Sequence, residues 1–267
     1  MDLQLADRVV VITGASKGIG LATARTLLEE DARVVAASRS TSPELEALDG
    51  DLLHVPVDLM DPHAPAHVIA AAIEAFGHVD ALVNNVGGPP PGVTMPRASF
   101  FDATDDDWRA VLELNLLAAV RATRAAIPVM LERGGGAIVN VSSAVARRPS
   151  PMNVDYAAAK AGLTNLTKVL SEEFGPQGIR VNTVSPGPVR TPWWTDEGGA
   201  ADIIAAQAGT DRDAVLTALA PEAMSLTTGR LADPQDIADV VTLLVSPRSA
   251  NIVGADFVVD SGMLKEV

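Results

Sequence analysis

The stretch Arg8-Val9-Val10-Val11-Ile12-Thr13-Gly14-Ala15-Ser16-Lys17-Gly18-Ile19-Gly20 decides the fold. Its first six residues form a β-branched run of strand length, and the glycine-rich segment leads directly into a helical pattern from Leu21 to Glu30. A strand, a glycine-rich turn and a helix are typical of a dinucleotide-binding βαβ unit, because glycines let the backbone approach a pyrophosphate at the helix N-terminus. The glycine spacing is G-x-x-x-G-x-G instead of the usual G-x-G-x-x-G.

Strand and helix patterns continue to alternate along the chain. Predicted strands comprise residues 32–38, 52–57, 80–85, 136–142, 179–184 and 256–260, and predicted helices comprise residues 61–76, 105–131, 156–174 and one that starts at 233. Buried parallel strands joined by helices indicate an α/β fold, a single-domain Rossmann-like doubly wound sheet of about seven parallel strands with helices on both faces. We expect one domain over residues 1–267, with a substrate-binding lid at roughly residues 190–232.

Composition restricts the classes of protein and partner. The net charge of −14 argues against nucleic acid or an anionic membrane as a partner. The chain has no cysteine, and its first residues lack a basic and apolar leader, which together favour a cytoplasmic protein. The apolar helix candidate from Trp108 to Leu131 carries four charged residues, so we expect a buried or interface helix and not a membrane span. His63-x-x-x-His67 contains Pro65, and no metal site is expected.

Tyr156 and Lys160 stand four residues apart in a predicted helix, so their side chains project from one face. An ammonium beside a phenol favours the phenolate and is expected to pull a pKa of about 10 towards neutrality. The tyrosine then becomes a usable general acid or base, and the nearby Ser143 hydroxyl can hold a substrate oxygen. Taken alone, such a pair is more often two surface residues of a helix.

Other segments strengthen this interpretation, because they follow different strands of the predicted sheet. Residues 14–20 follow the first strand, residues 85–88 the fourth, Ser143 the fifth and residues 185–187 the sixth. In a doubly wound sheet, ligands bind outside the carboxyl ends of the strands. The convergence of these segments at one edge predicts an enzyme.

The motifs resemble the short-chain dehydrogenase/reductase family in its compact single-domain form. The resemblance covers roughly residues 5–262 and rests on Thr13-Gly14-x-x-x-Gly18-Ile19-Gly20, Asn84-Asn85-x-Gly87, Asn115, Ser143, Tyr156-x-x-x-Lys160 and Pro186-Gly187. It implies a catalytic tetrad of Asn115, Ser143, Tyr156 and Lys160. Tyr156 is expected to protonate the carbonyl oxygen during reduction, and Lys160 to lower the tyrosine pKa and to bond the nicotinamide ribose.

The remaining tetrad members carry open alternatives. The family's serine-to-tyrosine interval selects Ser143 over Ser142 as the residue that holds the substrate oxygen. Asn115 is expected to hold a water that relays protons to Lys160. A helix asparagine that bonds backbone is an equal alternative for Asn115.

The resemblance also implies a set of cofactor contacts around the same edge. They are Gly14, Ser16, Lys17, Gly18, Ile19, Gly20, Ser38, Arg39, Asp58, Asn85, Gly87, Tyr156, Lys160, Pro186, Gly187 and Thr191. Asp58 is expected to contact the adenine, with a strand-end cap as the alternative. Thr191 is expected to bond the carboxamide, with a simple turn residue as the alternative.

The end of the second strand predicts NADP(H), with NAD(H) as the alternative. An acidic residue there binds the 2′-hydroxyl of NAD, whereas a nearby arginine accommodates the 2′-phosphate of NADP. The family's acidic position is Ser38 here, and Arg39 follows it. Lys17 offers a second positive charge. Arg39 as a solvated surface charge is the alternative.

The substrate is only partly indicated. Trp193 and Trp194 open the lid and suggest a fairly large, partly apolar substrate, although they could equally pack the lid onto the body. Met152 and Val154 precede the tyrosine and are expected to line the same pocket as Ser143.

Three functions are consistent with the sequence. The first is an NADP(H)-dependent oxidoreductase of a ketone or secondary alcohol. The second is a 3-oxoacyl-thioester reductase that acts with a carrier protein, which the acidic net charge disfavours. The third is a non-catalytic dinucleotide sensor, which the complete tetrad argues against. The resemblance also implies a homotetramer, or a homodimer, assembled through the long helices that contain Asn115 and Tyr156.

Overall fold

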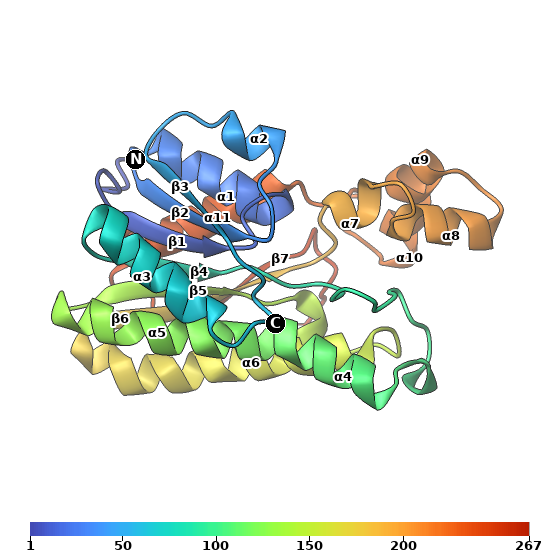
Figure 1. Cartoon of the computed structure of the whole chain (residues 1–267). Helices are drawn as coiled ribbons and strands as arrows, with labels where there is room; N and C mark the ends of the chain where they lie inside the picture. The colour runs from blue at the N-terminus through green and yellow to red at the C-terminus, as the bar shows by residue number, and fades with distance from the viewer. Residues whose placement is uncertain (267) are drawn as a thin grey trace.

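Seven parallel strands form the central layer of the molecule, in the order β3-β2-β1-β4-β5-β6-β7 (Figure 1). This computed structural model describes residues 1–266. The strands are β1 (Val9–Thr13), β2 (Arg33–Ser38), β3 (Leu52–Pro56), β4 (Ala81–Asn84), β5 (Gly136–Val141), β6 (Ile179–Pro186) and β7 (Asp256–Val259). The strand order reverses its direction between β1 and β4, and this point is where a doubly wound sheet binds ligands. The predicted fold class is confirmed.

Helices cover both faces of this sheet. They are α1 (Gly18–Glu29), α2 (Pro43–Glu46), α3 (Ala64–Phe76), α4 (Asp105–Leu112), α5 (Ala118–Glu132), α6 (Val154–Phe174), α7 (Pro192–Thr195), α8 (Ala200–Ala208), α9 (Arg212–Ala214), α10 (Ala220–Ala223) and α11 (Pro234–Val245). Successive side chains of β1 enter opposite layers, as the period of two requires. Val10 and Ile12 pack in the core that α1 and α11 share, and Val9 and Val11 pack in the core beneath α3 and α5.

Two predicted helices differ in detail from the observed ones. The helix expected from residue 61 begins at Ala64, because the Asp61 carboxylate accepts a hydrogen bond from the main-chain N–H of His63 and closes a turn instead. The helix expected over residues 105–131 is divided by a π-helical turn, η2 (Glu113–Leu117), between α4 and α5. Helix α11 begins directly after Asp233, as predicted, and the main-chain N–H of Asp233 donates to Asp236 Oδ2 at 2.8 Å.

The helical segment Asp105–Glu132 has the length and mean hydropathy, 1.3, of a membrane span. Its apolar side chains, including Ala122, Ala126 and Ile127, are buried against the sheet. This packing accounts for the hydropathy as that of a core-facing helix.

Residues 190–232 extend beyond the carboxyl ends of the strands (Figure 1). The segment contains α7 to α10 and a second π-helical turn, η5 (Val215–Leu219). It has its own hydrophobic cluster, which includes Trp194, Val215 and Leu216. The segment is thus packed internally instead of being a loop spread over the sheet.

Candidate active site

Asn85 ties the turn after β1 to the end of β4. Its main-chain N–H donates to Thr13 Oγ1 at 3.0 Å, and its side-chain amide donates to the carbonyl oxygens of Thr13 and Gly14, each at 3.0 Å. Asn85 therefore shapes the glycine-rich turn. A direct contact between Asn85 and a cofactor stays a prediction.

The glycine-rich turn depends on glycine at two kinds of position. Gly14 and Gly18 have φ angles of +70° and +57°, in the left-handed region that side chains disfavour. A Cβ on Gly20 would lie 2.3 Å from the carbonyl oxygen of Gly14. Glycine at this position lets α1 begin directly against the end of β1.

The N-terminus of α1 suits an anion. Lys17 is the N-cap residue, and within residues 1–266 it makes no side-chain capping bond; the first turn holds no acidic residue. The first N–H groups of the helix and the positive end of its dipole are left for a negatively charged partner. These features fit the pyrophosphate of a dinucleotide at Gly18, Ile19 and Gly20.

The end of β2 lies beside this turn. The Ser42 hydroxyl donates to the carbonyl oxygen of Ser16 at 2.8 Å and so joins the two loops. Ser38 is 7% exposed, and its hydroxyl donates to the Ser40 carbonyl oxygen at 2.9 Å and lies 3.0 Å from His54 Nε2.

Lys17 and Arg39 are both exposed on these two joined loops. Lys17 Nζ lies 3.9 Å from Asp196 Oδ2 at the end of α7, while Arg39 forms no ion pair with any residue from 1 to 266. Two cationic side chains thus stand on the joined loops after β1 and β2, and the neutral Ser38 occupies the position directly before Arg39 where an acidic residue would bind NAD.

The two serines after β5 have different partners. The Ser142 hydroxyl is buried, donates to the carbonyl oxygen of Lys160 at 3.0 Å and lies 2.7 Å from the Thr164 hydroxyl. Ser143 is half-buried, and its hydroxyl hydrogen-bonds to the Tyr156 phenol. Ser142 therefore anchors α6, and Ser143 stands beside the tyrosine.

Lys160 is 2% exposed, an unusual environment for an ammonium group. Its Nζ donates to the carbonyl oxygen of Val141 at 2.8 Å and lies 5.7 Å from the centre of the Tyr156 ring. Burial lowers the pKa of Lys160 to about 8. Helix α6 thus brings both side chains to the end of β5, as their spacing predicted.

The prediction that Lys160 pulls the tyrosine towards neutrality is wrong in this structure. Burial raises the pKa of Tyr156 to about 12, and the hydrogen bond with Ser143 offsets only part of this rise. Desolvation penalises the phenolate, and the ammonium that should favour it is bonded to Val141 and is itself disfavoured by burial. The phenol keeps its proton at neutral pH.

Asn115 lies in η2 and is 1% exposed. Its Oδ1 accepts from the N–H of Gly88 at 2.8 Å, and its Nδ2 donates to the carbonyl oxygens of Gly88 and Val111, each at 3.0 Å. The alternative of a helix asparagine bonding backbone is confirmed. A water relay through Asn115 stays a prediction.

Gly87 lies close to the side chains of both Lys160 and Asn115. A Cβ on Gly87 would lie 2.9 Å from Lys160 Nζ and 3.0 Å from Asn115 Oδ1. The loop after β4 therefore passes directly over the lysine, which only a glycine permits.

The segments that follow β3 and β6 also lie at the carboxyl ends of the strands. Asp58 Oδ1 accepts from the N–H of Met60 at 3.0 Å, which is the strand-end cap weighed above. Thr191 approaches the glycine-rich turn, because a Cβ on Gly18 would lie 3.2 Å from its Cγ2. Gly187, which follows Pro186 at the end of β6, would place a Cβ 2.6 Å from the Cα of Asp260. The ends of β1, β6 and β7 thus meet at one edge.

The predicted substrate residues are spread over two segments. Trp193 and Trp194 form an edge-to-face pair with ring centres 5.0 Å apart, and Trp194 is only 3% exposed within the cluster of residues 190–232. Trp194 therefore packs mainly within this segment and does not fasten it to the sheet, whereas Trp193 is half-buried. Met152 is exposed, and Val154 begins α6, directly before the tyrosine's turn.

The histidines do not gather with carboxylates into a metal site. His63 precedes α3, and His67 lies in its first turns. Across the described range, residues 1–266, no three histidine, aspartate or glutamate side chains are arranged to hold a metal ion.

Sequence reasoning missed a buried ion pair next to Tyr156. Asp155 is fully buried and Arg97 is 9% exposed, and the Arg97 guanidinium pairs with the Asp155 carboxylate. The N–H of Arg97 donates to Asn153 Oδ1 at 2.8 Å, and the N–H of Asn153 donates back to the Arg97 carbonyl oxygen at 3.1 Å. The loop before α4 is thereby fastened to the start of α6. Only the position of Asp155 beside Tyr156 hinted at this, because its partner is 58 residues away.

A doubly wound sheet with an anion-ready helix N-terminus, and with a serine, a tyrosine and a lysine at the same edge, defines a dinucleotide-dependent oxidoreductase. The family described as short chain dehydrogenase matches residues 8–201. The chain belongs to the short-chain dehydrogenase/reductase family, whose members act on alcohols and ketones.

Relatives cover the whole chain. It is 32% identical over 265 residues to a 2,5-dichloro-2,5-cyclohexadiene-1,4-diol dehydrogenase of Sphingobium indicum, which covers 97% of each chain. It is 33% identical over 264 residues to a 3-oxoacyl-(acyl-carrier-protein) reductase of Vibrio cholerae, which covers 98% of this chain and 99% of the relative. The crystal structure of L-sorbose reductase from Gluconobacter frateurii, complexed with NADPH and L-sorbose, superposes with a TM-score of 0.90 at 34% identity and covers all of both chains.

Proposed function

We propose that the protein is an NADP(H)-dependent oxidoreductase that interconverts a ketone and a secondary alcohol, with Tyr156 as the general acid and base. The observation that carries the proposal is the placement of the Tyr156 phenol between the Ser143 hydroxyl and the buried Lys160, at the edge where the N-terminus of α1 is open to an anion. The cofactor supplies or accepts the hydride at the substrate carbon when it is bound.

The chain's own residues then handle the oxygen and its proton. Ser143 holds the substrate oxygen through its hydroxyl, which already bonds the phenol. Tyr156, neutral at pH 7 because burial raises its pKa to about 12, donates its proton to that oxygen in the reducing direction. Lys160, which would hold the nicotinamide ribose, supplies the replacement proton with the help of a water held by Asn115. This protonation state favours reduction at neutral pH and oxidation at high pH.

NADP(H) is the proposed cofactor because positive charge and a neutral strand end occur together. Lys17 and Arg39 are exposed on two loops that the bond between Ser42 and Ser16 joins. Ser38 offers no carboxylate to repel a 2′-phosphate. The similarity to L-sorbose reductase, which was crystallised with NADPH, supports the same choice.

The proposed substrates are small polyhydroxylated or cyclic ketones and their alcohols. The names of the relatives point to a ketose and to a cyclic diol. Trp193, Met152 and Val154 are the side chains proposed to contact the carbon skeleton, beneath a lid formed by residues 190–232. A 3-oxoacyl-thioester reductase is the second candidate, supported by the 33% identity to the Vibrio cholerae enzyme.

We propose a cytoplasmic homotetramer, with a homodimer as the alternative, assembled through α5 and α6. Two large apolar side chains on this side of the molecule are exposed, Leu117 at 38% and Val169 at 52%. Light scattering coupled to size-exclusion chromatography measures the mass of the assembly. A monomer at micromolar concentration would contradict the proposal.

The deciding experiment compares the wild type with Tyr156→Phe on a panel of ketoses, cyclic ketones and 3-oxoacyl thioesters, with NADPH and NADH side by side. We expect turnover with NADPH on one substrate class and a loss of about 100- to 10,000-fold in kcat for the variant, because the proton donor is removed. The dissociation constant of NADPH should stay within about twofold. Equal kcat in both proteins would contradict the role of Tyr156, and turnover confined to thioesters would favour the second candidate.

A further inference from the structure

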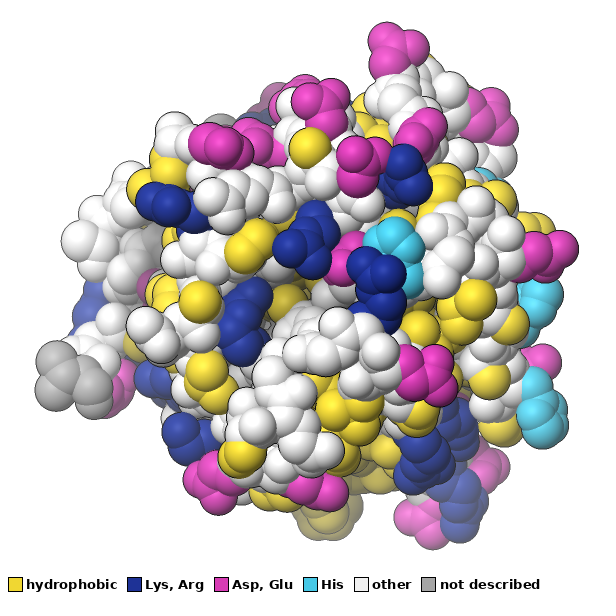
Figure 2. All heavy atoms as spheres, turned by 90° about the vertical axis from the view of Figure 1, so that its left-hand side faces the viewer, with side chains coloured by type: hydrophobic (Ala, Val, Ile, Leu, Met, Phe, Trp, Pro, Cys, Tyr) yellow, Lys and Arg dark blue, Asp and Glu magenta, His cyan; other side chains and the backbone are white. Residues whose placement is uncertain are grey.

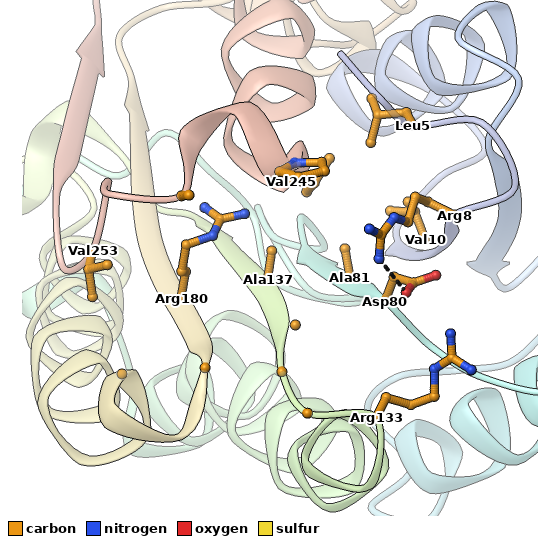
Figure 3. Close-up of a pocket in the computed structure, with 17 residues that line it drawn as sticks. Leu5, Arg8, Val10, Asp80, Ala81, Arg133, Ala137, Arg180, Val245 and Val253 are labelled. Carbon is orange, nitrogen blue, oxygen red and sulfur yellow. Dashed lines mark hydrogen bonds and ion pairs between the residues drawn. The ribbon is translucent and has the colours of Figure 1, made fainter.

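A cavity of about 430 Å³ opens at the amino ends of the strands (Figure 3). Its floor consists of the buried side chains of Val10, Ala81 and Ala137, at the beginnings of β1, β4 and β5. Much of its wall is main chain, because Gly134 to Gly136 line one side. The floor is therefore apolar, and the side formed by the glycines has no side chains.

Three arginines surround this floor, with a single carboxylate. Arg8, Arg133 and Arg180 line the cavity together with Asp80. Three guanidinium groups less one carboxylate leave a formal charge of about +2, in a chain whose net charge is −14. Figure 2 shows basic side chains gathered around the hollow on this face of the molecule.

The carboxylate of Asp80 is already engaged. Arg8 Nη1 lies 2.9 Å from Oδ1, while Oδ2 accepts from the N–H of Val9 at 2.9 Å and lies 3.0 Å from His78 Nε2. Asp80 is thus saturated by Arg8 and its neighbours. It does not neutralise Arg133 or Arg180, and neither of these forms an ion pair with any residue from 1 to 266.

Arg180 is fixed in place by uncharged acceptors. Its Nη1 donates to the carbonyl oxygen of Leu244 at 2.9 Å and to the Ser249 hydroxyl at 2.9 Å, and its Nη2 donates to the Ser246 carbonyl oxygen at 3.1 Å. These bonds cap the C-terminus of α11, so the residue also has a structural purpose. They leave Nε and one Nη2 hydrogen without an acceptor among residues 1–266.

Arg133 approaches from the opposite side. It follows the last turn of α5 and is exposed, and in Figure 3 it comes from the end of α5, while the Arg180 side chain rises from β6. The two guanidinium groups without a counter-ion therefore border the same cavity. One is held rigidly, and the other has freedom to close over an occupant.

We propose that this cavity is a second ligand site, for a small organic anion that carries two or more phosphate or carboxylate charges. Guanidinium groups bind both kinds of anion through paired, charge-assisted hydrogen bonds. The volume lies in the range of small-molecule sites, and the apolar floor suits the carbon skeleton of such a ligand. The site is independent of the cofactor and catalytic residues, which lie at the other edge of the sheet.

Isothermal titration calorimetry tests the site with inorganic pyrophosphate and with citrate, on the full chain saturated with NADPH so that the cofactor's phosphate contacts are occupied. We expect one or both probes to bind, and Arg133→Ala to weaken binding about tenfold or more, as the loss of a charge-assisted contact predicts. Because Arg133 is exposed, the variant should fold normally. Arg25→Ala, at an exposed arginine of α1, is the control and should leave binding unchanged.

The outcomes separate clearly. Pyrophosphate alone identifies a phosphate site, and citrate alone identifies a carboxylate site. The proposal is overturned if neither probe binds at about 10 mM, which is about a hundredfold above the dissociation constant of a weak metabolite site. Equal weakening by Arg133→Ala and Arg25→Ala also overturns it, because that result would indicate only a diffuse charge effect. Turnover is not the readout, so the result is independent of the proposed activity.

Discussion

The buried ammonium group of Lys160 lowers the stability of the fold and also carries the chemistry proposed for it. Its pKa is about 8 in the folded chain against 10.5 for an unperturbed lysine, so unfolding takes up a proton between these two values. Where the unfolded state binds more protons, the free energy of unfolding rises with pH. The lysine therefore destabilises the fold most fully below pH 8, and this effect disappears above about pH 10.5.

We expect Lys160→Met to raise the free energy of unfolding at pH 7 by about 1–3 kcal/mol and to abolish turnover. The gain should shrink between pH 8 and 10.5, because in this range the wild-type lysine has lost its proton in the folded state but keeps it in the unfolded state. Urea unfolding of the cofactor-free proteins at pH 7, 9 and 10.5 measures it. Lys168→Met, at an exposed lysine of the same helix, is the control and should show no such trend; a gain independent of pH would contradict the explanation.

Breaking the buried pair of Arg97 and Asp155 should be strongly destabilising, because one buried charge then loses its closest partner. Asp155→Asn removes the fully buried partner of the Arg97 guanidinium and leaves only Asp107, at 3.5 Å, as a counter-charge, which we expect to cost about 3 kcal/mol of unfolding free energy. Asp106→Asn, which breaks the exposed pair with Arg109, should cost at most about 0.5 kcal/mol. Thermal unfolding of both variants makes the comparison. Similar small losses would show that the buried pair does not hold α6 in place.

At the scale of elements, the strand ends were predictable and the contacts between loops were not. The β-branched run of β1 and its glycine-rich turn determine where α1 begins, because both signals are local. The start of α3 was misplaced because the Asp61 side chain closes a turn, which competes with capping. The link between Arg97 and Asn153 and the π turn η2 depend on tertiary packing, which no local pattern encodes.

The end of β2 is the element that should decide between the two cofactors. The double substitution Ser38→Asp and Arg39→Ser replaces a neutral serine and a cationic arginine by an aspartate and a neutral serine, so the strand end becomes anionic. We expect the ratio of kcat/KM for NADPH over NADH to fall about 30- to 150-fold, equivalent to about 2–3 kcal/mol. Steady-state kinetics with each cofactor measures the ratio, and Arg25→Ser is the control. An unchanged ratio would show that this strand end does not face the 2′-position.

At the scale of the whole molecule, residues 190–232 behave as a second packing unit beside the sheet. Trp194 is buried in the cluster of this segment, so Trp194→Ala should remove about 3–5 kcal/mol of packing there. We expect faster tryptic cleavage after Arg212 and Arg230, and a rise in substrate KM with little change in NADPH affinity. Trp108→Ala, at a half-buried tryptophan outside the segment, is the control. Equal protection of both arginines in wild type and variant would argue that the segment has no local stability of its own.

The position of β4 beside β1 has a consequence for the nascent chain on the ribosome. Val10 pairs with Ala81, and Thr13 bonds Val83 across 70 residues of sequence, so β1 cannot gain this neighbour until the fourth strand has been synthesised. At roughly 5–20 residues per second, one edge of β1 stays bare for roughly 4–14 seconds of translation. During that interval the main chain of Val9–Thr13 has an unpaired edge, and its five side chains, buried in the folded protein, are incompletely covered. The first two helical crossovers, or a chaperone, must then prevent this strand from pairing with another chain.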